Sequence, residues 1–265
     1  MTASRNPQAD EIAHESMVRN LAAQAEAVWP QEREIVARYP APDRVLDVGC
    51  GTGEIARRVA ELFPGAIVTA ADLHRPHLQR GKQVTERVDF VQADAFHLPV
   101  ADRTFDLTLC RHMLQMVPEP LEVLREMMRV TREGGRLHVL GEDYAMMHFH
   151  PTRLDCDRFW HEGPMVFARS TGTDLRVGRA VFTMLKQLGA RDLRVDYVVL
   201  DTLRAPRETF AAIWEAWRDG YSDSIVRNSR LTREEVRAYW EDMIASIRNP
   251  EGYGVWFIPI VGGTV

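Results

Sequence analysis

The stretch at residues 44–65 reads RVLDVGCGTGEIARRVAELFPG, and it decides the fold. Its first part, Val45 to Val48, predicts a short apolar strand that runs into a glycine-rich turn. A helix follows, because Ile55, Val59 and Leu62 then lie on one face. A strand that passes through a glycine turn into a helix is a common beginning of an open α/β sheet.

The alternation of strands and helices continues along the chain. Apolar strands are predicted at 66–72, 88–94, 105–112 and 136–143, with helices in most of the intervals. Farther on we expect a helix at 178–188, a strand at 191–200, a helical pair at 206–248 and a last strand at 253–261. Apolar strands separated by helices indicate a parallel sheet covered on both faces. The predicted fold is α/β: a Rossmann-like, seven-stranded, mostly parallel sheet with helices on both faces and a helical lid.

Composition and charge narrow the classes of function. The net charge is −5, and no cluster of lysines and arginines stands free of acidic neighbours, which argues against a nucleic-acid partner. No apolar run reaches the roughly 18 residues that span a bilayer, and the polar N-terminus does not resemble a signal peptide. Cys50, Cys110 and Cys156 form no CxxC pair, as is usual for reduced thiols. We therefore expect a cytoplasmic protein with no membrane partner.

Three acids occupy matching places on the first three strands. Asp47 precedes the first glycine by two residues, Asp72 ends the second strand and Asp94 ends the third. The carboxyl ends of parallel strands meet at the edge where open α/β sheets bind ligands, so the three acids should face one site. The turn reads GxGxG, whereas a dinucleotide site reads GxGxxG and has no need of the third acid.

Five stretches together resemble the motifs of one enzyme family. They are VLDVGCGTGE (45–54), ADLH (71–74), QADAFHLPVADRTFD (92–106), LCRHMLQMVPEP (109–120) and TREGGRLHVL (131–140). In this combination the chain resembles the class I S-adenosylmethionine-dependent methyltransferases over roughly residues 43–142. Within that family it is similar to the small-molecule enzymes related to ubiquinone and menaquinone biosynthesis.

The resemblance implies S-adenosylmethionine as the cofactor. The implied contacts are Asp47, Gly49, Cys50, Gly51, Gly53, Asp72, Leu73, Asp94, Ala95, Phe96 and Arg111. Asp72 can accept both ribose hydroxyls, Asp94 can read the exocyclic amine of adenine, and Asp47 orders the turn or reaches the methionyl ammonium. Two alternatives stay open. Gly53 and Leu73 could serve only the turn and the packing, and Arg111 could pair with an acid on a helix instead.

The resemblance and the strand pattern predict six segments. They are an N-terminal helical lid segment (1–40), the cofactor-binding core (41–143), a lid and substrate segment (144–172), a continuation of the core (173–201), an inserted helical lid (202–250) and a final core strand (251–265). The lid segments depart from the regular pattern of the sheet, and residues 144–172 are rich in aromatic, Met and His residues.

Candidates for the chemistry follow the fourth and fifth strands. Methyl transfer from a sulfonium is an in-line displacement, and a base is needed only when the acceptor arrives protonated. His112 and Tyr144 are the predicted catalytic residues, because both follow strands that should border the methyl group. Either could instead be structural: His112 could bond a neighbouring carbonyl, and Tyr144 could be lid packing.

Four further residues are predicted to contact the acceptor: Glu142, His148, Trp217 and Tyr221. Core packing is the alternative for the two tryptophans of WEAW, Trp214 and Trp217, which lie on one side of a helix. His148, His150 and His161, with acids nearby, offer metal-ligand types, but no thiolate pair supports them and methyl transfer needs no metal, so we expect none.

The predicted function is methyl transfer to an O, N or C atom of a small, aromatic or polyketide-like metabolite. Two alternatives remain. The cofactor fold could catalyse another reaction such as a cyclisation, or the acceptor could be a protein or nucleic acid. The negative charge argues against nucleic acid, and the fourth strand is not followed by the N/D-P-P-Y/F tetrapeptide of enzymes that methylate base amino groups. The sequence leaves the oligomeric state open.

Overall fold

The computed structural model describes residues 6–8 and 14–265. Residues 1–5 and 9–13, which belong to the predicted lid segment 1–40, lie outside the described residues. The first part of the chain contains α1 (His14–Val36), β1 (Arg44–Val48), α2 (Glu54–Leu62), β2 (Ile67–Asp72), α3 (Arg75–Val84), β3 (Val88–Gln92), β4 (Phe105–Arg111), α4 (Pro120–Val130) and β5 (Thr131–Leu140). The second part contains β6 (Met147–His150), α5 (Cys156–Glu162), α6 (Pro164–Ser170), α7 (Gly178–Gln187), β7 (Arg191–Asp201), α8 (Arg207–Asn228), α9 (Arg233–Arg248) and β8 (Tyr253–Thr264).

The first five strands form a parallel sheet in the order β3-β2-β1-β4-β5. β8 continues the sheet antiparallel to β5, and β7 pairs antiparallel with β8 on its other side. The expected α/β class with a mostly parallel sheet is confirmed. Because β1, β2, β3 and β4 run in the same direction, their carboxyl ends meet at one edge, where the glycine turn and the acids are placed.

The sheet has eight strands, and the seven expected from the sequence are one too few. The additional strand is β6, in the segment 144–172 for which no period was evident. β6 pairs with β8 from Met147–Trp256 to His150–Tyr253. It has 4 residues, and its partner lies much later in the chain, so it carries little local signal.

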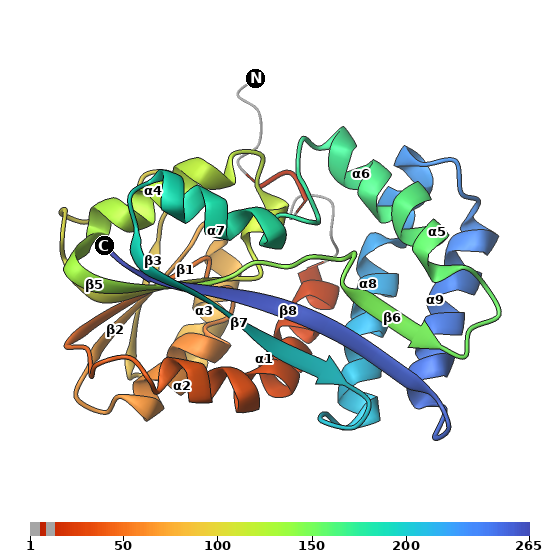
Figure 1. Cartoon of the computed structure of the whole chain (residues 1–265), viewed down its shortest axis with the longest axis horizontal. Helices are drawn as coiled ribbons and strands as arrows, with labels where there is room; N and C mark the ends of the chain where they lie inside the picture. Colours follow the sequence, from red (N-terminus) through yellow and green to blue (C-terminus); the bar gives the residue numbers. More distant parts are fainter. Residues whose placement is uncertain (1–5, 9–13) are drawn as a thin grey trace.

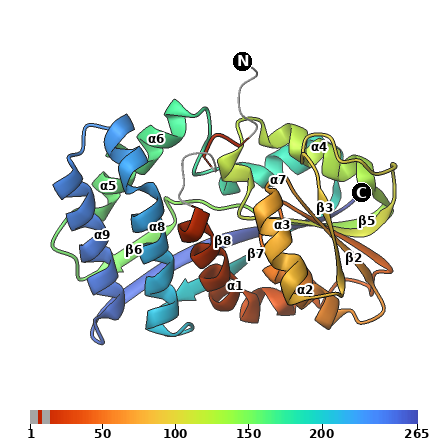
Figure 2. The ribbon, with the colours of Figure 1, turned by 180° about the vertical axis from the view of Figure 1, so that it is seen from behind.

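Helices cover both faces of the sheet. Figures 1 and 2 show α1, α2 and α3 on one face and α4 and α7 on the other. Trp29, Val59 and Leu78 pack beneath the first layer, and Leu124 and Val181 belong to the cluster beneath the second. Each face therefore has its own apolar core, and the cofactor edge lies between the two.

Helices α5, α6, α8 and α9, which we call the lid helices, gather beyond one end of the parallel strands. They surround the halves of β7 and β8 that lie farthest from those strands (Figure 1). Their core is aromatic: the ring of the buried Trp214 lies 4.8 Å from the ring of Phe210 and 4.9 Å from that of Trp217, between centroids. α8 also packs along α1. Among the described helices, none combines the length and the apolar character that crossing a membrane requires.

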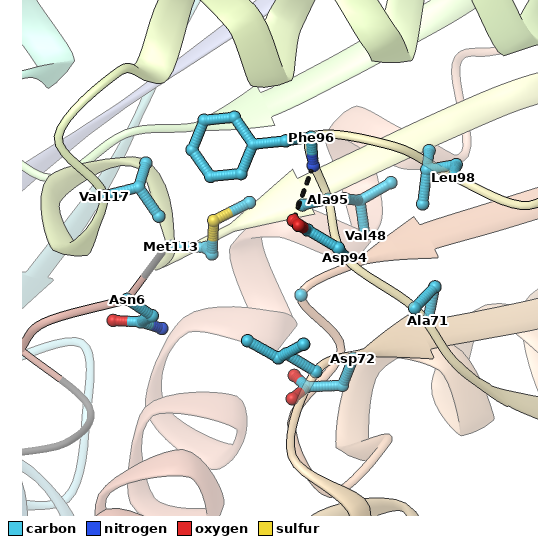
Figure 3. A pocket seen from close by; sticks show the side chains of 13 residues that line it. Asn6, Val48, Ala71, Asp72, Asp94, Ala95, Phe96, Leu98, Met113 and Val117 are labelled. Atoms are coloured by element: carbon cyan, nitrogen blue, oxygen red, sulfur yellow. Dashed lines mark hydrogen bonds between the residues drawn. The ribbon is translucent and has the colours of Figure 1, made fainter. Parts of the chain in front are cut away.

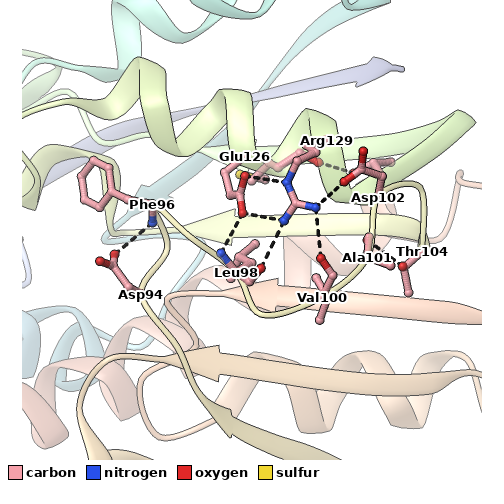
Figure 4. A network of polar contacts seen from close by, with 11 residues as sticks. Asp94, Phe96, Leu98, Val100, Ala101, Asp102, Thr104, Glu126 and Arg129 are labelled. Atoms are coloured by element: carbon pink, nitrogen blue, oxygen red, sulfur yellow. Dashed lines mark hydrogen bonds and ion pairs between the residues drawn. The ribbon is translucent and has the colours of Figure 1, made fainter.

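The loop after β3 is held from behind by α4. The Arg129 guanidinium donates to the carbonyl oxygens of Leu98 at 3.1 Å and Val100 at 3.0 Å and pairs with Glu126 and Asp102 (Figure 4). Glu126 Oε1 in turn accepts from the backbone N–H of Leu98 at 2.7 Å. This network fixes the far end of the loop that begins at Asp94.

Candidate active site

A cavity opens at the carboxyl edge of the parallel strands, and we call it the sheet-edge cavity. It is an open hollow with about 420 Å³ of space between the atoms, part of which is continuous with solvent. Gly49, Asp72, Leu73, Asp94, Ala95 and Phe96 are among the residues that line it. Figure 3 shows Asp72 and Asp94 on one side of this cavity, with Asn6 and Met113 across from them. The structure thus brings together most of the residues predicted to hold the nucleoside.

The glycine turn lies too close to its neighbours for side chains. Gly49 and Gly51 have φ of 72° and 56°, a conformation that residues with a Cβ rarely adopt. A Cβ on Gly49 would lie 2.8 Å from Met113 Cγ, and one on Gly51 would lie 2.6 Å from Leu21 Cδ1. Gly53, also at positive φ, is the N-cap of α2. The turn is a backbone cradle, and side chains there would fill it.

The two acids of the cavity are held by backbone N–H groups. Asp72 Oδ2 accepts from Gly51 N–H and Oδ1 from His74 N–H, both at 2.8 Å. Asp94 Oδ1 accepts from Phe96 N–H at 3.0 Å. Each carboxylate oxygen has a second lone pair. Asp72 is therefore fixed in place with acceptor capacity left for a diol.

Asp47 and Cys50 lie behind the cavity lining. Asp47 is 3% exposed, and burial raises its pKa to about 7, although Arg111 nearby opposes that shift. Burial also raises the pKa of the Cys50 thiol, with the charges of Asp47 and Asp72 acting in the same direction. The Cys50 backbone N–H donates to the Ala71 carbonyl at 3.0 Å. Both residues support the turn from within the protein.

Arg111 is paired with an acid on α1. Its Nε donates to Glu32 Oε1 at 2.6 Å, and its terminal nitrogen lies 2.6 Å from Oε2. His138 Nε2 lies 2.8 Å from Glu32 Oε1, and Tyr39 OH lies 3.1 Å from His138 Nδ1. Burial by itself would raise the pKa of Glu32, but Arg111 and His138 lower it to about 2. The sequence left open whether Arg111 pairs with an acid on a helix, and Glu32 is that acid.

A second cavity adjoins the first on the side of α1, and we call it the α1 cavity. It encloses about 630 Å³ of empty space and shares Gly49, Asp72 and Met113 with the sheet-edge cavity. Met17 and Leu21 of α1 line it, as do Arg111 and His112 of the region after β4. The two cavities together run from Asp94 to His112 along the strand ends.

The backbone of His112 adopts a conformation that is unusual for histidine. Its φ is 51°, and its side chain is 6% exposed. Its Nδ1 lies 2.5 Å from Glu142 Oε1, while its buried Nε2 has no hydrogen-bond partner in the part of the chain that the structure describes. A non-glycine residue at positive φ costs on the order of 1–3 kcal/mol and occurs preferentially at functional sites.

Glu142 joins four donors in the interior. Besides His112 Nδ1, its carboxylate accepts from Gln24 Nε2 at 3.2 Å, from Gln115 Nε2 at 2.7 Å and from the hydroxyl of Tyr144. The Glu142 side chain is 1% exposed. His112 and Tyr144, the two predicted catalytic residues, are therefore bonded to the same carboxylate.

Tyr144 leads into a third cavity, which we call the aromatic pocket. Its cavity volume is only about 20 Å³, so the side chains around it are closely packed. Tyr144, Trp160, Phe167, Trp217, Tyr221 and Trp240 are among the residues that line it. The ring centroids of Tyr144 and Trp217 lie 5.0 Å apart. Burial raises the pKa of Tyr221, and the charge of Glu142 adds to the effect. Of the four predicted acceptor residues, Trp217 and Tyr221 line this pocket, and Glu142 lies behind it, bonded to Tyr144.

His148 does not join them. It is exposed on β6, paired with Val255, and it lines none of the three cavities. Sequence reasoning also missed Gln24 and Glu32 on α1. A signal was present: Gln24, Val28, Glu32 and Val36 recur at every fourth position, and all four are buried. Polar residues on the apolar stripe of a helix indicate buried partners.

Comparisons with known proteins agree with this geometry. The model of the methyltransferase domain family matches residues 46–139. The chain is 41% identical over 102 residues to methyltransferase GfsG of Streptomyces halstedii, covering 36% of each chain. It is 42% identical over 110 residues to the demethylmenaquinone methyltransferase of Renibacterium salmoninarum, covering 42% of this chain and 45% of that one.

Solved structures share the fold at low identity. Phosphoethanolamine N-methyltransferase 2 of Haemonchus contortus matches with a TM-score of 0.62 and 17% identity, covering 99% of this chain and 60% of that one. The cyclase SpnF matches with a TM-score of 0.53 and 21% identity, covering 91% and 84%.

The matches identify residues 46–139, from β1 to β5, as a methyltransferase domain of the class I S-adenosylmethionine-dependent type. The chain spans less than half the length of the two curated relatives described above. Its lid, with α5, α6, α8 and α9, lies outside the matched family segment.

Proposed function

We propose that the protein binds S-adenosylmethionine along the strand ends and transfers its methyl group to a small-molecule acceptor held in the aromatic pocket. The observation that carries this proposal is a chain of contacts between the two sites. The glycine cradle and Asp72 border the α1 cavity, and a single buried carboxylate, Glu142, connects His112 of that cavity to Tyr144 of the aromatic pocket.

The residues present fit the cofactor. Asp72 is the proposed ribose acceptor, since each of its oxygens keeps a lone pair after binding a backbone N–H. Asp94, Ala95 and Phe96 would surround the adenine, and Leu73, which is 45% exposed, would cover its edge. Gly49, Gly51, Gly53 and Cys50 shape the cradle, while Asp47 supports it from behind and Arg111 lines the α1 cavity. When bound, the sulfonium supplies an activated methyl group.

The acceptor is proposed to be a small aromatic or polyketide-like molecule. Six aromatic or phenolic side chains line the aromatic pocket, and such rings bind flat apolar molecules by stacking and edge contacts. Trp217 and Tyr221 of α8 are the proposed contacts, whereas His148 is exposed elsewhere. The chain's role is to align the acceptor with the methyl group and to exclude water.

The test of the cofactor site is calorimetry on Asp72→Ala. Removing a buried charge-assisted acceptor costs roughly 1.5–3 kcal/mol, so S-adenosylmethionine should bind about 10–100-fold more weakly. Asp89→Ala is the matched control, because Asp89 is an exposed acid on the neighbouring strand β3. Unchanged affinity in Asp72→Ala, with the fold intact by circular dichroism, would remove Asp72 from the site.

Methyl transfer and cyclisation are separated by the product. Incubation with labelled S-adenosylmethionine and a panel of phenolic and polyketide-like metabolites should release S-adenosylhomocysteine if a methyl group is transferred. A conversion that leaves the cofactor intact would favour the alternative in which this fold catalyses another reaction.

A further inference from the structure

Glu142 is placed to act on the reaction without touching the acceptor. Its two oxygens already receive four donors, from Gln24, His112, Gln115 and Tyr144, and the side chain is 1% exposed. An ionised carboxylate offers about four acceptor positions, and here all of them are used. Direct contact with an acceptor would require one of these bonds to break.

We propose that Glu142 is a positioning residue that holds His112 in the tautomer with the proton on Nδ1, so that Nε2 serves as the general base. The proposal rests on the methyl transfer proposed above and deepens it. Gln24 and Gln115 present amide N–H groups, and Tyr144 presents its O–H, so the carboxylate acts as an acceptor toward each of them. An ionised carboxylate can only accept, so toward His112 it accepts as well, and Nδ1 then carries the proton.

The other ring nitrogen is then a bare acceptor. His112 Nε2 is buried and has no hydrogen-bond partner among the described residues. A buried acceptor without a partner destabilises the fold, and such groups call for an explanation. Because His112 lines the α1 cavity, a hydroxyl brought there from the aromatic pocket would satisfy it. The positive φ of His112 is a second sign that its placement is enforced.

Hydrogen bonds around His112 hold it in this placement. Gln115 Nε2, besides its bond to Glu142, donates to the backbone carbonyl of His112 at 2.8 Å. Gln24 reaches Glu142 from α1, the helix whose Leu21 and Met17 line the same cavity. Closing these bonds fixes both the ring and the backbone of His112. A base held in one tautomer and one orientation is the arrangement that histidine–carboxylate pairs use in other enzymes.

A general base at His112 Nε2 restricts the class of acceptor. A base contributes only if the acceptor carries a proton that must leave, so the site suits a phenol or enol hydroxyl better than a neutral amine or a thiolate. As the acceptor oxygen forms its bond to the methyl carbon, the carbon–sulfur bond breaks and its electron pair stays on sulfur. The hydroxyl proton moves to His112 Nε2, and Glu142 stabilises the resulting imidazolium.

The test reads the tautomer directly and needs no acceptor. Nitrogen-15 NMR on histidine-labelled protein saturated with S-adenosylhomocysteine should show His112 with Nδ1 protonated and Nε2 bare, assigned by the loss of its signals in His112→Gln. In Glu142→Gln the single tautomer should give way to a mixture, because an amide can donate or accept. Asp143→Asn is the matched control: Asp143 is equally buried, but it pairs with Arg179 at 2.6 Å, so the His112 signals should not change.

Activity supplies a second reading once an acceptor is found. Glu142→Gln and His112→Ala should each lower kcat about 10²–10⁴-fold, and the double variant should be no slower than His112→Ala, since Glu142 acts only through His112. The affinity for S-adenosylhomocysteine should stay within about twofold in all three variants.

Two results would overturn the inference without touching the proposed function. One is a wild-type His112 that carries its proton on Nε2 while S-adenosylhomocysteine is bound. The other is a double variant whose loss is the product of the two single losses. Absence of any binding of S-adenosylmethionine or S-adenosylhomocysteine would instead defeat the proposed function itself.

Discussion

Asp47 is a single residue whose protonation the fold controls. Burial raises its pKa from 3.8 to about 7, against the opposing charge of Arg111. The folded state therefore holds a proton that the unfolded chain releases at lower pH. Its contribution to stability is complete below the ordinary pKa of 3.8 and is lost as the pH rises through about 7.

We predict that Asp47→Asn removes this pH dependence. Between about pH 5 and about pH 8 the wild-type protein without ligand should lose at most roughly 2.7 kcal/mol of stability, at 1.36 kcal/mol per unit from pH 5 to the folded-state pKa of about 7. The variant should stay level over that range. Melting temperatures across the range give the answer, with Asp89→Asn as a control of equal charge change on an exposed site. Parallel curves for wild type and Asp47→Asn would show that Asp47 is ionised throughout.

The residues at strand ends could be assigned from the sequence, and the interior polar residues could not. Asp72 and Asp94 end predicted strands, so their common location follows from the parallel direction of β2 and β3. Glu142 also follows a strand, and it was predicted near the acceptor. Its four donors come from α1, the turn after β4 and Tyr144, and no local pattern states that they converge.

At the scale of elements, α1 is attached to the sheet by a buried ion pair. Glu32 is fully buried and binds Arg111 of β4 and His138 of β5. Attraction to these two groups holds the pKa of Glu32 at about 2, although burial favours the neutral acid. The stability that this pair gives is present above the ordinary pKa of 4.5 and is lost as the pH falls through about 2.

We predict that Glu32→Gln destabilises the protein by about 3–5 kcal/mol, because it leaves the Arg111 guanidinium buried without its anion. Urea denaturation at neutral pH measures the loss. The double variant Glu32→Gln with Arg111→Met should recover much of it, since replacing both charges removes the unpaired one. Equal losses in the single and double variants would mean that packing of α1, and not the ion pair, sets the cost.

Elements with a strong internal period were predictable, and those defined by distant partners were not. α2 and α4 show their buried stripes in sequence, with Ile55 and Val59 in one and Val123 and Met127 in the other. β6 has only Met147 buried between exposed neighbours, and it exists as a strand because β8 lies beside it. A local sequence pattern cannot predict pairing with a strand that comes about a hundred residues later in the chain.

At the scale of the whole molecule, α1 and β8 each join the core of the lid to a core of the sheet. On α1, Ala27 and Val28 pack into the lid core, while Trp29 and Val36 pack under the sheet. On β8, Trp256, Ile258 and Ile260 face the lid core, and Val261 belongs to the core beneath α4 and α7. Figure 1 shows β8 running from the lid helices to the parallel strands without a break. Unfolding either the lid or the sheet would therefore expose apolar surface of the other to water.

We therefore predict that lid and sheet unfold in one cooperative transition. Five of the six tryptophans lie in the lid core, so tryptophan fluorescence reports on the lid, whereas circular dichroism reports on the whole chain. The two urea curves should share one midpoint. S-adenosylhomocysteine at about 100 times its Kd should raise the free energy of unfolding measured by both probes by the same amount, close to 2.7 kcal/mol, although its proposed site lies only along the strand ends. If the fluorescence midpoint came first and did not move with ligand, the lid would be a separate folding unit, and the shared helix and strand would carry no coupling between the halves.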